Sequence, residues 1–171
     1  MYPRKLIKIL ENDLSKRHIS IILGPRQVGK TTCLNALHKK TGGLFLDLDI
    51  LYNFEKINTY ENAIGTLKIH GYQEEQEETF FLYLDEFQSF NDITKVLKNI
   101  YDHHSNIKII ATGSSSLTIK NRIQESLAGR KRIFNLYPLS FEEFLIFKER
   151  EDLAEQLNNI RNITDTTSIN T

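Results

Sequence analysis

Several features that define whole classes of proteins are scarce or absent in this sequence. Its 171 residues include no tryptophan and one cysteine, Cys33, which excludes an internal disulfide and a cysteine zinc cluster. Lys plus Arg and Asp plus Glu each total 22, so no overall positive field draws the chain to nucleic acid or to an anionic membrane. No apolar run approaches the length of a transmembrane helix, and the N-terminus lacks the apolar core of a signal peptide. These absences favour a single cytoplasmic domain.

The stretch from residue 19 to residue 32 carries the strongest functional signal. Residues 19–23 form a short apolar run that predicts a buried strand, and from residue 30 onward apolar side chains recur at helical spacing. A phosphate-binding loop of the pattern G-x-x-x-x-G-K-[ST] requires this order of strand, loop and helix. The four positions of the pattern are occupied by Gly24, Gly29, Lys30 and Thr31.

Each part of this loop has a chemical role. Glycine lets the backbone curl so that N–H groups point at an anion, and the positive end of the helix dipole adds to the attraction. Lys30 supplies a mobile charge for the β- and γ-phosphates, and Thr31 supplies a hydroxyl for Mg²⁺. Arg26 could also meet phosphate, although a solvent-facing role fits its position equally well. The predicted nucleotide-binding residues are Gly24, Pro25, Arg26, Gln27, Val28, Gly29, Lys30, Thr31 and Thr32.

A second apolar run, at residues 79–84, ends in two acids, Asp85 and Glu86. Such a run fits a strand that is buried on both faces of a parallel sheet. Mg²⁺ takes only one or two protein carboxylates, so we expect Asp85 to be a metal ligand together with Thr31. Glu86 would polarise the attacking water, which favours hydrolysis over binding alone. The alternatives are a helix or turn cap for Asp85 and a surface acid for Glu86.

The remaining pattern predicts an α/β fold with a mainly parallel sheet. Strands are expected at 44–49, 107–111 and 131–137, with helices between them on both faces of the sheet. Ser140 and Glu143 have the spacing of a capping box at the start of a late helix. We expect a nucleotide-binding domain over residues 1–150, and a short helix with a polar, disordered tail over residues 151–171.

Two further positions could contribute to hydrolysis. Ser114 or Thr112 could be a polar sensor of the γ-phosphate or of the attacking water, although helix capping by Ser114 to Ser116 explains these residues equally well. Arg130 could supply positive charge in the transition state, either within one chain or from a neighbouring molecule, or could simply begin a strand. The His103-His104 pair lacks metal-ligand partners at helical spacing, which favours a surface turn.

Five segments occur here in the order in which they occur in one known family. On these segments, about residues 4–147 resemble the prokaryotic AAA-family ATPases of the AAA_14 type. The resemblance implies ATP rather than GTP, with Mg²⁺, and a three-layer α/β/α P-loop NTPase fold of the ASCE type with five strands in the order 5-1-4-3-2. It also implies Ser114 as the sensor and Arg130 as a phosphate-sensing or finger residue. The segments are GPRQVGKTT (24–32), LYLDEFQ (82–88), ATGSSS (111–116), SLAGR (126–130) and LYPLSFEEF (136–144).

Members of that family usually continue into a second domain, whereas this sequence ends in a polar stretch. The leading hypothesis is a Mg²⁺-dependent ATPase whose nucleotide state changes its contacts with a protein partner, a second domain or another copy of the chain. The alternative is a truncated ATP-binding interaction module with little or no hydrolysis. Nucleic-acid remodelling has the weakest support, because the chain is neutral and its basic cluster at residues 130–132 is small.

Overall fold

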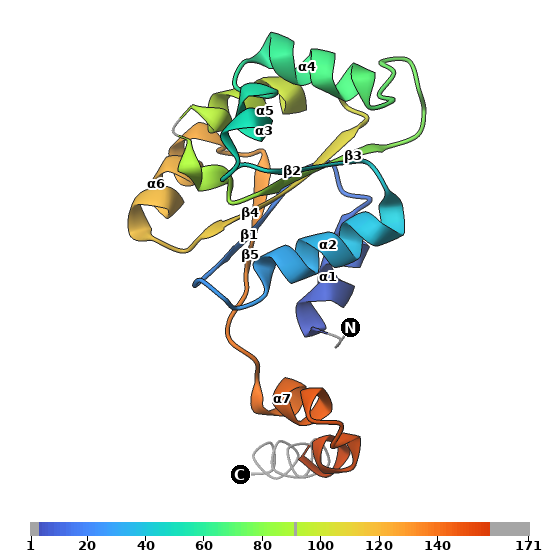
Figure 1. The fold of residues 1–171 in the computed structure, drawn as a ribbon, viewed down its shortest axis with the longest axis vertical. Coiled ribbons are helices and arrows are strands. Elements are labelled where there is room, and N and C mark those ends of the chain that lie inside the picture. Colours follow the sequence, from blue (N-terminus) through green and yellow to red (C-terminus); the bar gives the residue numbers. More distant parts are fainter. Residues whose placement is uncertain (1–3, 91, 158–171) are drawn as a thin grey trace, which may run out of the picture.

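Five parallel strands form one sheet in the order β2-β3-β4-β1-β5 (Figure 1). Read from the other edge, this is the order 5-1-4-3-2 that the resemblance implied, so the predicted α/β class and strand order are confirmed. The structure is a computed structural model and describes residues 4–90 and 92–157. The strands are β1 Ile19–Gly24, β2 Leu44–Asp47, β3 Phe80–Asp85, β4 Ile107–Ser114 and β5 Lys131–Asn135.

Helices cover both faces of the sheet, which gives three layers (Figure 1). The helix α1 and the helix α2 lie on one face, and α3, α4, α5 and α6 lie on the other. The helices are α1 Lys5–Asp13, α2 Lys30–Thr41, α3 Leu51–Glu55, α4 Tyr60–Ile69, α5 Ile93–His103, α6 Leu117–Ser126 and α7 Phe141–Phe147, with a 3-10 turn η1 at Phe87–Ser89.

Alternation along the central strands divides the apolar side chains between two cores. Ile21 and Leu23 of β1 join the core beneath α4 and α5, whereas Ile22 joins the core beneath α1 and α2. Cys33 lies fully buried in this second core, where burial raises the pKa of its thiol. A packing role for this cysteine follows.

Two expected element boundaries were wrong. The fourth strand continues to Ser114, because β4 pairs with β1 as far as Gly24, so the sensor candidates lie within a strand. The expected capping of the next helix by one of the serines is confirmed, since the Ser116 side chain accepts from the N–H of Ile119 in α6. The second strand ends at Asp47, whose side chain accepts from the N–H of Asp49 in a turn.

The expectation of a surface histidine pair was also wrong for His104. Its ring is buried, with Nε2 2.8 Å from the Tyr60 hydroxyl and Nδ1 2.8 Å from the Tyr72 hydroxyl. The Tyr72 hydroxyl also donates to Oδ1 of Asn106. This network connects α4 and the segment after it to the turn before β4, so His104 has a structural role.

The helix α7 extends away from the sheet, beyond the end of α1 and α2 (Figure 1). The predicted capping box is present, since the Ser140 hydroxyl accepts from the N–H of Glu143 and the Glu143 carboxylate accepts from the N–H of Ser140. Residues 151–157 are helical, and the tail predicted at 158–171 lies outside the described residues. Within the part of the chain that the structure describes, every helix is too short or too polar to cross a bilayer.

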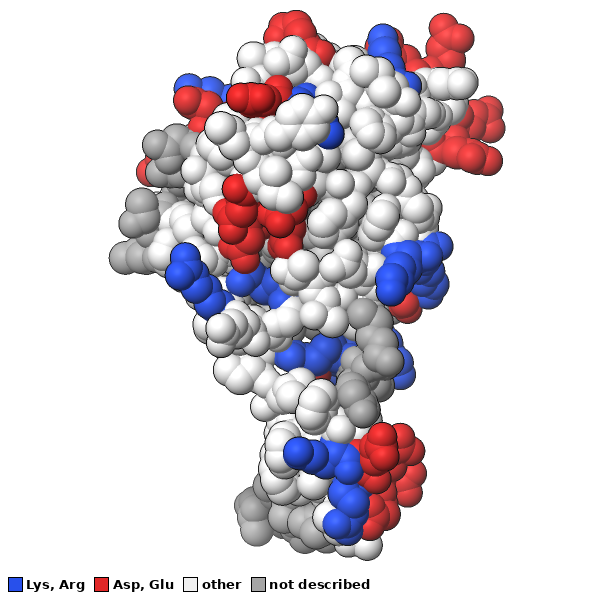
Figure 2. All heavy atoms as spheres, in the orientation of Figure 1, with Lys and Arg blue, Asp and Glu red and all other residues white. Residues whose placement is uncertain are grey.

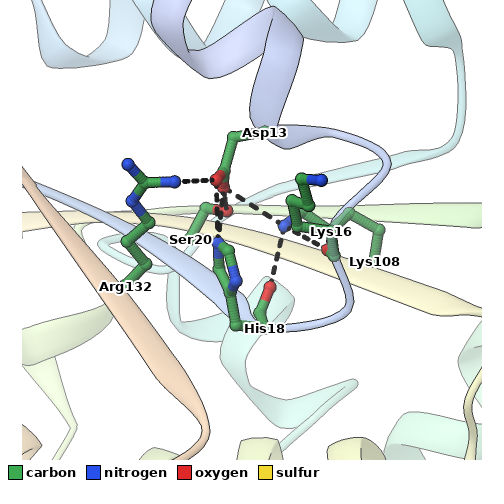
Figure 3. Close-up of polar contacts among 6 residues, drawn as sticks. All are labelled: Asp13, Lys16, His18, Ser20, Lys108 and Arg132. Atoms are coloured by element: carbon green, nitrogen blue, oxygen red, sulfur yellow. Dashed lines mark hydrogen bonds and ion pairs between the residues drawn. The ribbon is translucent and has the colours of Figure 1, made fainter.

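A buried polar cluster lies at the amino edge of the sheet, where the parallel strands begin (Figure 3). The carboxylate of Asp13 accepts hydrogen bonds from the hydroxyl of Ser20 and from Arg132, and it lies 2.8 Å from the His18 ring and 3.4 Å from Nζ of Lys108. Lys108 also donates to the carbonyls of Lys16 and His18, both at 2.8 Å. The cluster therefore fixes the connection from α1 to β1.

Candidate functional site

The phosphate-loop sequence forms a tight turn between β1 and α2. Gly29 takes the left-handed conformation, with φ of 95°, directly before the first residue of α2. Gly24 is required for another reason, because a Cβ there would lie 2.4 Å from the carbonyl oxygen of Leu136. The N–H of Leu136 in turn donates to Leu23 at 2.7 Å. The loop is thus packed against the chain that leaves β5, and α2 directs its free N–H groups toward the loop.

Lys30 is folded back across the loop. Its ammonium donates to the carbonyl of Pro25 at 3.0 Å and lies 3.4 Å from Oε1 of Glu86. Only 4% of the residue is exposed, so the charge is largely shielded from water. Thr31 and Thr32, in the first turn of the same helix, are exposed. The lysine and the hydroxyls that are predicted to meet phosphate and Mg²⁺ therefore lie on one helix turn.

The two acids follow one another at the carboxyl end of β3, but they face different surroundings. Asp85 is 3% exposed and accepts a hydrogen bond from the hydroxyl of Thr112 on the neighbouring strand β4. Thr112, fully buried, also accepts from the N–H of Glu86 at 3.1 Å. One threonine therefore positions both acids, which assigns to Thr112 a supporting role between them.

Glu86 has an unusual backbone conformation for a residue other than glycine. Its φ is 51°, in the left-handed region, which costs energy and persists only where neighbouring groups hold it. Its Oε2 accepts from Nε2 of Gln88 at 2.5 Å, while Oε1 faces Lys30. Gln88 also accepts from the N–H of Ser114 at 3.1 Å. The predicted base is thus held on both of its oxygens.

A hollow of about 320 Å³ lies beside the loop. On its far side is the segment leading into α7, and Arg4 bridges the two sides. The guanidinium of Arg4 donates to the carbonyl of Val28 at 3.0 Å, to the carbonyl of Tyr137 at 2.6 Å and to the Glu143 carboxylate at 3.1 Å. The hollow is lined by Arg4, Gln27, Val28, Gly29, Thr32, Leu139 and Phe147.

Both signs of charge occur on the face shown in Figure 2. Acidic side chains gather near α3, and Lys and Arg side chains lie directly below them on the side of α7. Within this region, the Ser89 hydroxyl donates to the Asp49 carboxylate at 2.6 Å, which connects η1 to the turn after β2. Asp49 therefore supports η1, the turn that directly follows Asp85 and Glu86.

The structure brings most of the predicted site residues together, but it separates Arg130 from them. The carbonyl of Arg130 accepts from Ile19, the first residue of β1, whereas the loop follows the last residue of that strand. A six-residue strand spans roughly 20 Å. The guanidinium is also paired with Asp102, at 2.6 and 3.0 Å. The expectation that Arg130 meets a phosphate within its own chain is wrong; a role toward a neighbouring molecule stays a prediction.

Gln88 and Arg4 are site residues that the sequence reasoning did not identify. Gln88 lies inside the segment LYLDEFQ, so its spacing of two residues from Glu86 was the available signal. No local pattern marks Arg4, because its partners are 24, 133 and 139 residues away in the sequence.

A comparison with protein-family models matches residues 16–145 to the AAA_14 model, described as an AAA domain. Among curated proteins, the uncharacterized protein MJ1637 of Methanocaldococcus jannaschii is 34% identical over 176 residues, covering 92% of this chain and 35% of its own length. The uncharacterized protein MJ1544 of the same organism is 32% identical over 149 residues, covering 84% of this chain and 33% of its own length. The chain thus spans about a third of the length of these relatives.

Solved structures share the fold at low sequence identity. The Walker-type ATPase PABY2304 of Pyrococcus abyssi superposes with a TM-score of 0.65 and 19% identity, over 88% of this chain and 57% of that one. PCH-2 of C. elegans gives a TM-score of 0.52 with 14% identity, over 81% of this chain and 41% of that one. A chain of Drosophila ORC bound to DNA gives 0.52 with 11% identity, over 82% and 93% of the two chains.

Proposed function

Since the chain belongs to the AAA_14 family of AAA domains, we propose that it binds ATP with Mg²⁺ and hydrolyses the bond to the γ-phosphate. The single observation that carries this proposal is the convergence of Lys30, Asp85 and Glu86 at the carboxyl edge of the sheet. Ligands of open α/β sheets bind at this edge. The oxygens and the ammonium required for phosphoryl transfer are therefore available on adjacent elements.

The donor set fits Mg²⁺ bound together with a nucleotide. Thr31 offers a hydroxyl and Asp85 offers a carboxylate, and Mg²⁺ commonly takes one or two protein oxygens and fills its other positions with water and phosphate. Among residues 4–90 and 92–157, no group of three or more His, Cys, Asp or Glu side chains could hold a metal without a nucleotide. When bound, Mg²⁺ would neutralise charge on the β- and γ-phosphate oxygens.

Binding of the phosphates would rearrange Lys30. The ammonium would exchange the Pro25 carbonyl and the Glu86 carboxylate for phosphate oxygens, while the loop N–H groups hold the same phosphates. This exchange would free Oε1 of Glu86 to accept a hydrogen bond from a water molecule. The water oxygen then bonds to the γ-phosphorus, the bond from that phosphorus to the bridging oxygen breaks, and ADP leaves with the bridging oxygen. The proton of the water passes to the carboxylate or to the released phosphate.

The hollow beside the loop is the proposed location of the base. Its volume of about 320 Å³ is near the lower end of the range of ligand sites. Leu139 and Phe147 supply apolar surface for an aromatic ring, and Val28 supplies more from the loop side. Since Arg4 is tied to carbonyl and carboxylate oxygens on both sides, it would keep the hollow open at a fixed width.

Isothermal titration calorimetry and a phosphate-release assay test the proposal. Lys30→Ala should abolish binding of Mg·ATP, whereas Lys39→Ala, an exposed lysine in the last turn of the same helix, should leave it unchanged. Glu86→Gln should bind ATP and release phosphate at least 100-fold more slowly. Unchanged affinity in Lys30→Ala would refute the site, and normal turnover in Glu86→Gln would remove Glu86 from the mechanism.

An ATP-binding interaction module with little hydrolysis is the second candidate function. It is favoured by the exposed aromatic side chains near α7, where Tyr137 and Phe141 are 68% and 60% exposed. Arg4 connects the same region to the loop through Glu143 and Val28, so occupancy of the loop could change what this surface presents to a protein partner or to a second copy. Binding of ATP by the wild type without phosphate release would favour this candidate.

A further inference from the structure

We propose that Gln88 is a positioning residue that couples the end of β4 to Glu86 and so sets the orientation of the base. The inference rests on the proposed hydrolysis of ATP. It concerns a side chain whose two polar atoms are both engaged within the site. Its amide nitrogen donates to Oε2 of Glu86 at 2.5 Å, and its amide oxygen accepts from the N–H of Ser114 at 3.1 Å.

The partners fix which way the amide points. A carboxylate oxygen can only accept and a backbone N–H can only donate, so the nitrogen of Gln88 must face Glu86 and its oxygen must face Ser114. A flipped amide would lose both hydrogen bonds. Gln88 therefore acts as a directional bridge between the base and the last residue of β4.

The backbone around this bridge is shaped to admit it. A Cβ on Gly113 would lie 2.7 Å from Oε1 of Gln88 and 2.9 Å from the Phe87 ring. Alanine at this position would therefore push the amide away from Ser114. The glycine thus permits the close approach of η1 to β4, which brings Gln88 within reach of both partners.

The bridge supports a base that would otherwise be poorly held. Glu86 occupies the left-handed region and is anchored on the backbone side by the N–H bond to Thr112. On the side-chain side, Lys30 holds Oε1 and Gln88 holds Oε2. The proposed binding of phosphate withdraws Lys30 from Glu86. Of these two side chains, Gln88 alone would then still donate a hydrogen bond to the Glu86 carboxylate. It would keep one oxygen fixed while the other faces the water.

The coupling makes Ser114 relevant through its backbone as well as its hydroxyl. A shift of the end of β4 toward the γ-phosphate would pull on the amide oxygen of Gln88 and turn the carboxylate at the other end. The route from Ser114 to Glu86 passes through one side chain. Replacing that side chain therefore separates the two ends of the route.

Steady-state phosphate release by the purified 171-residue chain tests the proposal. Gln88→Met keeps the length of the side chain without its polar atoms and should lower kcat about tenfold with KM for ATP within about twofold, because one hydrogen bond to a charged group is lost. Gln88→Glu retains an acceptor for Ser114 but places a second carboxylate against Glu86, and repulsion between the two carboxylates should lower kcat at least as much. Gln124→Met, an exposed glutamine of α6, is the matched control and should turn over ATP normally.

A double-mutant cycle distinguishes positioning from a general structural effect. In the Glu86→Gln background, Gln88→Met should cause no further loss of turnover, because the group through which it acts is already altered. Additive losses would overturn the proposal, as would a Gln88→Met variant with the wild-type kcat. A melting temperature within about 2 °C of the wild type excludes partial unfolding as the cause.

Crystal structures of wild type and Gln88→Met, each bound to Mg²⁺ and a non-hydrolysable ATP analogue, provide a readout that does not depend on turnover. Relative to the wild type, the Glu86 carboxylate of the variant should lie in a different position and Ser114 should lie farther from η1. If both lie where they do in the wild type, Gln88 does not position them and the proposal fails. Wild-type protein that binds ATP without releasing phosphate would instead refute the proposed hydrolysis, and this structural comparison would still decide the role of Gln88.

Discussion

Replacement of Asp13 by Asn should destabilise the fold strongly, although the residue lies at the opposite edge of the sheet from the phosphate loop. The Asp13 side chain is 1% exposed and neighbours four donors: Ser20, His18, Lys108 and Arg132 (Figure 3). Asparagine has nearly the same size but no charge. The Lys108 ammonium, 2% exposed, would then be buried without its carboxylate.

The expected cost follows from this burial. Removing one partner of a buried ion pair costs about 3–5 kcal/mol, because the other charge is left uncompensated. For a domain of this size, each kcal/mol lowers the melting temperature by about 2–4 °C, so Asp13→Asn should melt roughly 6–20 °C below the wild type. Thermal unfolding followed by circular dichroism at pH 7 measures this shift.

Two further variants make the reasoning refutable. Asp102→Asn breaks an exposed pair with Arg130 and should shift the melting temperature by no more than about 2 °C. Lys108→Met in the Asp13→Asn background removes the buried ammonium and should recover part of the loss. If Asp13→Asn and the Asp102→Asn control have the same melting temperature, the buried cluster around Asp13 does not stabilise the fold and the reasoning is wrong.

The pH dependence of the same variant has a definite sign. Burial raises the pKa of Asp13, but hydrogen bonds from Ser20 and His18, with the charge of Lys108, outweigh it and hold that pKa below its usual 3.8. The stabilisation from Asp13 is therefore complete above pH 3.8 and is lost as the pH falls through the lower folded value. The difference in free energy of unfolding between wild type and Asp13→Asn should therefore decrease as the pH falls below 3.8.

Three other predictions concern separate parts of the molecule. Arg4→Met removes the contacts that hold α7, so amide hydrogen exchange should accelerate over residues 136–147 and stay unchanged in β4. Burial lowers the pKa of Lys108 from 10.5 to about 8, so between about pH 8 and pH 10.5 the unfolded chain still binds a proton that the folded chain has released. The free energy of unfolding of wild type relative to Lys108→Met should therefore rise across this range. If Arg130 acts on a neighbouring molecule, mixing inactive Lys30→Ala with Arg130→Ala should restore phosphate release above the sum of the two variants; no restoration would exclude that role.

The α/β class and the location of the site were accessible from local pattern, whereas the order of the strands followed from the resemblance to the AAA_14 family. Apolar runs marked β1, β3 and β4, and the glycine, lysine and acid positions marked their carboxyl ends, because parallel strands present those ends at one edge. The boundaries of β4 were not accessible. Thr112 and Ser114 are good cap residues by themselves, and only pairing with β1 extends the strand through them.

The contacts that tune the site could not be derived from the sequence, because they join residues that are far apart. Thr112 of β4 donates to Asp85 at the end of the neighbouring strand β3, although the two residues are 27 positions apart in the sequence. The resemblance implied a phosphate role for Arg130, yet the direction of β5 brings this residue to the edge of the sheet opposite the phosphate loop. The sequence indicated a surface position for His104, but in the structure the hydroxyls of Tyr60 and Tyr72 contact both nitrogens of its buried ring. In each case the deciding partner is set by topology.

On the proposed mechanism, the pairing of Lys30 with Glu86 links the binding of ATP to the release of the Glu86 carboxylate. In that mechanism, phosphate oxygens compete with the Glu86 carboxylate for the Lys30 ammonium and weaken the ion pair between them. This competition requires a strongly negative ligand close to the lysine, and the γ-phosphate supplies charge that ADP lacks. On the proposed mechanism, the base is therefore released most completely when ATP is bound. Gln88 would still donate to Oε2 of Glu86 at that stage. The loss of the Lys30 contact would therefore free one oxygen of the carboxylate, while the bridge to β4 holds the other in place.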